Sequence, residues 1–128
     1  MRNTGRVVLV SGVDIIEIPR VRRVAERYGQ RFLERIYTEE EIGYCRGRAP
    51  QLASRFAAKE ALFKAIGTGW TEGITWLDAE VCNQPNGKPK LMLSGRALEE
   101  ATQLGVIKIW ISLTHTNRYA AAQVILER

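Results

Sequence analysis

The chain has 128 residues, of which 45% are hydrophobic and 26% charged, with a formal net charge of +5 and a pI near 9.6. This composition is typical of one globular domain over residues 1–128 and disfavours disorder or a metal-stapled mini-domain. Apolar runs fall far short of the roughly 20 residues that cross a bilayer, and the N-terminus has no long apolar signal core. We therefore expect a cytoplasmic protein with no membrane partner, whose basic surface attracts anions.

A strand and two helices are predicted for the N-terminal part of the chain. The segment Val7–Ile18 is dense in Val, Leu and Ile, which predicts a buried strand, although Asp14 and a second acid interrupt it. Pro19 suits the first turn of a helix that Gly29 ends. Apolar residues then continue at helical spacing over Gln30–Ile36, which predicts a second helix.

Two further helices are predicted before residue 67. Thr38 and Glu41 form a capping box, because the threonine hydroxyl can accept from the amide three residues on while the glutamate reaches back to the cap. A short helix to about Arg46 follows. The segment Gly47–Pro50 breaks it, and Gln51–Ile66, rich in Ala, Leu, Lys and Glu, is predicted to form a long helix.

A hairpin and a helix are predicted next. Alternation of apolar and polar residues over Thr75–Cys82 predicts a half-buried strand. Asn86–Gly87 supplies the left-handed conformations of a hairpin turn, and Lys90–Leu93 is the returning strand. Ser94 is placed to cap a helix that runs to Leu104.

The last predicted element pair sets the fold class. Val106–Leu113 and Tyr119–Leu126 are expected to form a hairpin around Thr114–Arg118. The whole chain is therefore predicted to be α+β, with a mostly antiparallel sheet packed with a long central helix and shorter helices. The cysteines Cys45 and Cys82 lie far apart without a CxxC motif, which favours two reduced thiols over a disulfide or zinc site.

Two carboxylates and a lysine are the candidate chemical groups. Glu60 and Lys64 are four residues apart on one face of the predicted long helix, a spacing that by itself favours a solvated ion pair. Asp14 interrupts an apolar strand, so we expect it to pair with a basic side chain, accept hydrogen bonds or bind a cation. Magnesium prefers one or two carboxylates plus waters and phosphates, so Asp14 and Glu60 would suffice for one site, and manganese fits the same ligands.

Three ordered blocks of sequence resemble the holo-acyl-carrier-protein synthases, the short type of phosphopantetheinyl transferase. The blocks are Gly12–Arg20, Arg55–Ala61 and Ser112–Thr116, with Asn86–Pro89 between the second and third. Together they span nearly the whole chain. Three blocks in order, in a chain of the family's usual length, are more specific than any single motif.

The resemblance implies magnesium-dependent transfer of the 4′-phosphopantetheine arm from coenzyme A to a serine of apo acyl carrier protein, in fatty acid biosynthesis, with release of adenosine 3′,5′-bisphosphate. Asp14 and Glu60 match the family's metal ligands, and Lys64 matches its phosphate-binding lysine. Glu60 and Lys64 are thus the predicted catalytic residues, and Glu60 is a candidate base for the serine proton. Arg55, Lys64 and His115 are predicted to bind coenzyme A. The resemblance also implies a homotrimer whose active sites lie between subunits, so we expect this chain to form a homotrimer.

Arginines recur at helical spacing on the first two predicted helices. Arg20, Arg23 and Arg27 form one positive face, and Arg31 and Arg35 form another. Acyl carrier proteins are strongly acidic, so Arg20, Arg27 and Arg31 are predicted to dock the carrier protein through long-range attraction. An ordinary solvated arginine face is the alternative.

Two other functions stay open at the level of single residues. The high pI admits a basic nucleic-acid-binding module, but the sequence has no helix-turn-helix or RNA-binding signature. A metal-dependent phosphohydrolase would use Asp14 and Glu60 on a pyrophosphate bond. The basic helices and the three blocks favour transfer to a carrier protein and no nucleic-acid partner, and leave open which carrier protein is preferred.

Overall fold

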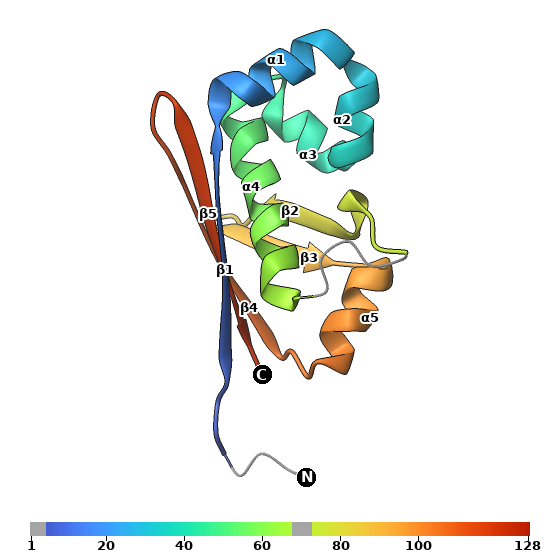
Figure 1. Ribbon diagram of the computed structural model, residues 1–128, viewed down its shortest axis with the longest axis vertical. Coiled ribbons are helices and arrows are strands. Elements are labelled where there is room, and N and C mark those ends of the chain that lie inside the picture. Colours follow the sequence, from blue (N-terminus) through green and yellow to red (C-terminus); the bar gives the residue numbers. More distant parts are fainter. Residues whose placement is uncertain (1–4, 68–72) are drawn as a thin grey trace.

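The computed structural model describes residues 5–67 and 73–128 and packs a long helix against one face of an antiparallel sheet (Figure 1). The α+β class predicted from the sequence is confirmed. Along the first half of the chain the elements are β1 (Leu9–Glu17), α1 (Ile18–Tyr28), α2 (Gln30–Ile36), α3 (Glu39–Cys45) and α4 (Ala49–Ile66). The second half contains the 3-10 turn η1 (Trp76–Asp78), β2 (Ala79–Asn83), β3 (Pro89–Leu93), α5 (Gly95–Gln103), β4 (Lys108–His115) and β5 (Tyr119–Glu127).

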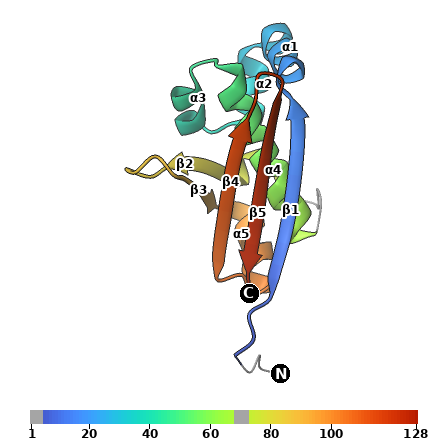
Figure 2. The same ribbon diagram turned by 90° about the vertical axis from the view of Figure 1, so that its left-hand side faces the viewer.

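The main sheet has the strand order β1-β5-β4, with both pairs antiparallel. On the central strand β5, buried and more exposed residues alternate, as expected for a strand with one face against the core. The buried set is Ala120, Ala122, Val124 and Leu126. Strands β2 and β3 form a separate two-stranded sheet. Figure 2 shows β4, β5 and β1 in front of α4, and no helix among the described residues covers the outer face of the main sheet.

Helix α4 approaches β1 very closely at Gly12. A side-chain carbon at Gly12 would collide with the carbonyl oxygen of Ala61, so only glycine fits there. Asp14 is two residues along the same strand, and Glu60 and Lys64 flank Ala61 on the helix. The close approach at Gly12 therefore brings the predicted metal ligands toward each other.

Replacing Gly12 with alanine is expected to lower the free energy of unfolding by about 1–3 kcal/mol, because the methyl group forces the helix and strand apart. Denaturant titration followed by circular dichroism measures this loss. The matched control is Gly43→Ala in α3, where an added methyl meets no atom within 4 Å. That variant should be as stable as the parent or slightly more so, because alanine favours helix. Equal unfolding midpoints for the two variants would contradict the packing argument.

The prediction that Val7–Ile18 forms a buried strand is wrong about both its burial and its bounds. Side chains alternate along β1, and those on its outer face are exposed, including Val13 at 55% and Ile15 at 65%. Both faces of β1 carry apolar residues. The high density of apolar residues in the sequence therefore did not reveal that only one face of the strand meets α4. An apolar strand face left exposed in one chain is a feature of interaction surfaces.

Two local predictions also differ from the structure. Helix α4 begins at Ala49, because Pro50 occupies its first turn instead of breaking the chain there. The hairpin turn is closed by a bond from the Gly87 amide to the Gln84 carbonyl oxygen at 2.8 Å, and among non-glycine described residues only Arg46 has a positive φ. Asn86 is therefore not left-handed, and Gly87 alone supplies that conformation with a φ of 87°.

The carboxylate of Asp78 explains two further differences. It accepts hydrogen bonds from the backbone and hydroxyl of Thr75, which closes η1 where a strand was predicted from residue 75. It also accepts from the amide of Ala97 at 3.2 Å in the first turn of α5. Ser94 occupies the cap position but its side chain makes no capping bond, so Asp78 takes the role predicted for it.

The predicted helices of residues 18–46 are confirmed. α2 has the predicted bounds, and the capping box of Thr38 and Glu41 at the start of α3 is present in both directions. Both cysteines are free thiols, with Cys45 buried and Cys82 partly exposed. Within the described parts of the chain, no helix is both long and apolar enough to cross a membrane.

Candidate active site

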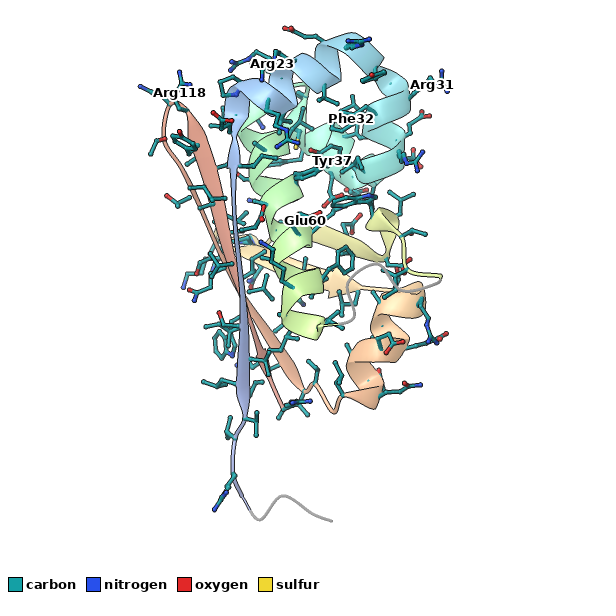
Figure 3. The ribbon with its side chains drawn as sticks, viewed as in Figure 1. Arg23, Arg31, Phe32, Tyr37, Glu60 and Arg118 are labelled. Carbon is teal, nitrogen blue, oxygen red and sulfur yellow. The ribbon has the colours of Figure 1, made fainter. Side chains whose placement is uncertain are left out.

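Asp14 and Glu60 line one cavity of about 530 Å³, Asp14 from β1 and Glu60 from α4. Apolar side chains form much of the remaining wall, among them Phe32 and Phe56, and Arg20 also lines the cavity. Figure 3 shows Glu60 on α4 and Phe32 on α2. The two carboxylates that the sequence offered as metal ligands are thus brought into the same cavity.

Lys64 pairs with Asp14, not with Glu60. Its Nζ donates to Asp14 Oδ1 at 2.9 Å and to the carbonyl oxygen of Val13 at 3.1 Å. The hydrogen bond to Asp14 is the main reason why the pKa of Lys64 is raised. The Lys64 side chain is 54% exposed, so it can leave Asp14 for a bound anion at little cost.

The carboxyl group of Glu60 lies in an environment that disfavours its charge. Burial raises its pKa, the negative charge of Asp14 raises it further, and the ammonium of Lys64 lowers it. A raised pKa makes Glu60 a better proton acceptor near neutral pH than a fully solvated glutamate. The same repulsion between carboxylates would be relieved by a cation bound between them.

These residues fit a hard divalent cation such as magnesium. Carboxylate oxygens are the ligands that magnesium prefers, and two of them leave room for waters and substrate phosphates. Over residues 5–67 and 73–128, no group of three or more His, Cys, Asp and Glu side chains is arranged to hold a metal ion. Asp14 and Glu60 would therefore hold it as a pair, without a closed protein cage.

Two of the predicted coenzyme A ligands do not line this cavity. Arg55 is buried on another side of α4, where its Nη2 donates to Asn83 Oδ1 at 2.7 Å. His115 is exposed at the end of β4, and its Nδ1 lies 3.3 Å from the carbonyl oxygen of Thr116. Within one chain, the structure brings together Asp14, Glu60 and Lys64 and leaves Arg55 and His115 apart from them.

The predicted arginine faces lie at one end of the molecule. Figure 3 shows Arg23 on α1 and Arg31 on α2 at its upper end. Arg20, Arg23, Arg27, Arg31 and Arg35 are all exposed. None of them forms an ion pair with a carboxylate of the described residues. Their charge is therefore available to an acidic partner.

A buried ion pair between α3 and α4, outside the cavity lining, was missed by the sequence reasoning. Lys59 and Glu41 are both fully buried, with Nζ and Oε1 2.7 Å apart. Lys59 also donates to the carbonyl oxygens of Ile36 and Trp76, and Glu41 accepts from the amide of Val81 at 2.8 Å. The pair thereby ties α2, α3, η1 and β2 to α4.

One signal could have indicated this pair. Lys59 is three or four residues from Phe56, Leu62 and Phe63, so it lies on an apolar stripe of the predicted helix that is expected to face the core. The sequence assigned Glu41 only to the capping box of α3. In the structure Glu41 also accepts a hydrogen bond from the amide of Val81. Which acid meets which lysine depends on how α3 packs on α4, and sequence spacing does not give that.

Known proteins resemble this chain over most of its length. Residues 11–124 match the family described as the 4′-phosphopantetheinyl transferase superfamily. The holo-[acyl-carrier-protein] synthase of Koribacter versatilis is 48% identical over 124 residues, which cover 94% of this chain and 99% of that protein. The holo-[acyl-carrier-protein] synthase of Geobacter sulfurreducens is 46% identical over 125 residues, which cover 95% of this chain and 99% of that protein.

Solved structures of similar proteins share the fold. The Helicobacter pylori holo-[acyl-carrier-protein] synthase in complex with coenzyme A is 29% identical, with a TM-score of 0.83, and the match covers 91% of this chain and 98% of that one. The Bacillus anthracis enzyme in complex with CoA (3′,5′-ADP) is 36% identical, with a TM-score of 0.76. That match covers 95% of this chain and 98% of the Bacillus anthracis chain. Both the sequence and the fold comparisons thus extend across nearly the whole chain.

Proposed function

This chain belongs to the 4′-phosphopantetheinyl transferase superfamily and is a transferase of the holo-[acyl-carrier-protein] synthase type, and from that premise we propose the details of its reaction. It transfers the 4′-phosphopantetheine arm of coenzyme A to a serine hydroxyl of apo acyl carrier protein, with magnesium, in fatty acid biosynthesis. The observation that carries the proposal is the single cavity lined by Asp14 and Glu60, with Lys64 bound to Asp14.

The reaction needs charge neutralisation and a proton acceptor. Asp14 and Glu60 would hold magnesium, which when bound neutralises charge on the pyrophosphate oxygens. Lys64, which is largely exposed, would bind a phosphate oxygen once it leaves Asp14. Glu60 would accept the serine proton as the bond from the serine oxygen to phosphorus forms. The bond to the departing adenosine 3′,5′-bisphosphate breaks in the same transfer.

The remaining coenzyme A contacts are proposed to come from a second subunit. Arg55 and His115 do not line the cavity of Asp14 in one chain, so in a homotrimer a neighbouring subunit would supply them. The exposed outer face of the main sheet supports such an assembly. Its most exposed apolar residues are Leu9, Val13, Ile15 and Trp110. Sedimentation equilibrium measures the oligomeric state directly.

The acidic carrier protein is proposed to dock on the arginines of α1 and α2. Arg20 of α1 lines the same cavity as Glu60, so a carrier protein bound to this helix would hold its serine close to Glu60. Arg27 and Arg31 extend the positive face away from the cavity along α1 and α2. The location would be the cytoplasm, where the free thiols Cys45 and Cys82 stay reduced.

Reversing the charge of Arg20 and Arg27 to Glu is expected to raise the KM for carrier protein by about tenfold or more, with much less effect on the KM for coenzyme A. Steady-state kinetics with each substrate varied in turn measures both constants. Lys90→Glu/Arg128→Glu makes the same charge change on β3 and at the exposed residue after β5, and should keep the parent KM for carrier protein. Equal carrier-protein KM values for the two double variants would remove the docking assignment.

Intact-protein mass spectrometry tests the reaction itself. Apo acyl carrier protein is incubated with this enzyme, coenzyme A and magnesium, with chelator and acceptor Ser→Ala controls. Transfer predicts a mass gain of one phosphopantetheine that both controls abolish. Release of nucleotide from coenzyme A without a gain on the carrier protein would instead indicate a phosphohydrolase. A gain that persists with chelator would contradict the magnesium assignment.

A further inference from the structure

The guanidinium of Arg55 is a buried positive charge without an ion-pair partner. Its residue is 4% exposed, and the salt bridges of the described residues do not include it. Its one hydrogen bond within those residues goes from Nη2 to Asn83 Oδ1 at 2.7 Å, and Nε is buried without a partner. Burying a cation in this way is costly unless an anion joins it.

Neutral groups hold this cation in place. The guanidinium carbon of Arg55 lies 4.2 Å from the centre of the Tyr44 ring, whose negative face attracts it. The same ring lies 5.2 Å from the guanidinium carbon of Arg48, which is itself fixed by bonds to the carbonyl oxygens of Tyr44 and Cys45. An aromatic ring and an amide oxygen orient Arg55 and leave its full charge available.

We propose that Tyr44 and Asn83 are positioning residues that aim Arg55 at a phosphate of coenzyme A, an inference that rests on the proposed function. A carboxylate in place of either group would hold the guanidinium equally well but would cancel its charge. The sequence blocks that indicated the family include Arg55 but neither Tyr44 nor Asn83. Tyr44 comes from α3 and Asn83 from the end of β2, so only the fold brings them to Arg55.

The substitution Asn83→Asp separates positioning from simple structural support. A carboxylate at residue 83 would form a buried ion pair with Arg55, so the melting temperature should stay the same or rise. The affinity for coenzyme A, measured by isothermal titration calorimetry, should fall about tenfold, because the new carboxylate competes with the ligand phosphate. An unchanged affinity in a folded variant would overturn the inference for Asn83.

Two substitutions of Tyr44 test the ring. Tyr44→Ala should weaken coenzyme A binding roughly three- to tenfold, and Tyr44→Phe, which keeps the aromatic face, should bind like the parent. Tyr28→Ala is the matched control, because Arg27 lies 5.4 Å from that ring on α1, and its affinity for coenzyme A should not change. A loss in Tyr28→Ala equal to that in Tyr44→Ala would overturn the role of the Tyr44 ring.

The parent protein and Arg55→Met distinguish failure of this inference from failure of the proposed function. If the parent does not bind coenzyme A, the proposed function fails and the inference fails with it. If the parent binds and Arg55→Met binds equally well, Arg55 does not contact the ligand and the positioning role is excluded. If only Arg55→Met loses affinity, while the Asn83 and Tyr44 variants bind normally, the inference alone is wrong.

Discussion

Glu60→Gln is expected to lower kcat by about 10²- to 10⁴-fold while the protein stays folded. Glutamine has the same shape as glutamate, but it cannot accept the serine proton and is a poor magnesium ligand. The Glu60 carboxyl is partly buried in the cavity beside Asp14, so removing its charge also ends the repulsion between the two carboxylates. The fold should therefore tolerate the change, with a melting temperature equal to or above that of the parent.

Rates from the mass-spectrometric transfer assay and Mn²⁺ binding followed by electron paramagnetic resonance separate the two roles of Glu60. Loss of both turnover and Mn²⁺ binding indicates a metal ligand, and loss of turnover with Mn²⁺ still bound indicates the proton acceptor. Glu39→Gln changes an exposed carboxylate at the start of α3, outside the cavity, and should turn over like the parent. Full activity in Glu60→Gln would remove both assignments.

Lys59→Met is expected to lower the free energy of unfolding by about 3–5 kcal/mol, because it leaves the fully buried carboxylate of Glu41 without its cation. For a chain of this size, a loss of that order lowers the melting temperature by roughly 10–20 °C. The position is central, since Lys59 and Glu41 join the end of α2, α3, η1 and β2 to α4. Differential scanning calorimetry measures the shift.

A double-mutant cycle with Glu41→Gln tests the pairing itself. Removing both charges leaves no unpaired buried ion, so Lys59→Met/Glu41→Gln should lose at least about 1 kcal/mol less than the sum of the single losses. Lys64→Met truncates an exposed lysine on the same helix and should change stability by less than about 1 kcal/mol. Additive losses in the cycle would show that the two side chains do not stabilise each other.

Local interactions made much of the helical region predictable. The capping box of Thr38 and Glu41 and the helix ending at Gly29 depend on residues three or four positions apart, and both are present. The predicted strand at residues 75–78 failed because Asp78 bonds to Thr75 and to Ala97 of α5. That second contact crosses from one element to another, and alternation of apolar residues carries no information about it.

The candidate site also has one part that the sequence predicted and one part that only the fold decided. The resemblance to one family identified Asp14, Glu60 and Lys64 as a group, because Asp14 and Glu60 lie in its blocks and Lys64 follows Glu60 by one helical turn. It suggested the pair of Glu60 and Lys64 from their spacing, whereas Lys64 binds Asp14, fifty positions away in the sequence. That contact exists because Gly12 lets α4 lie against β1.

The sequence by itself determined the fold class, most helix boundaries and the family, and it supplied the residues that are proposed to do the chemistry. Those properties follow from near-neighbour interactions and from the order of motifs along the chain. Only the tertiary structure decided that Lys59 is buried against Glu41, that Arg55 faces Asn83 and Tyr44, and that the outer face of β1 is exposed. Each of these depends on which side of a helix or strand meets its neighbour, and long-range packing sets that choice.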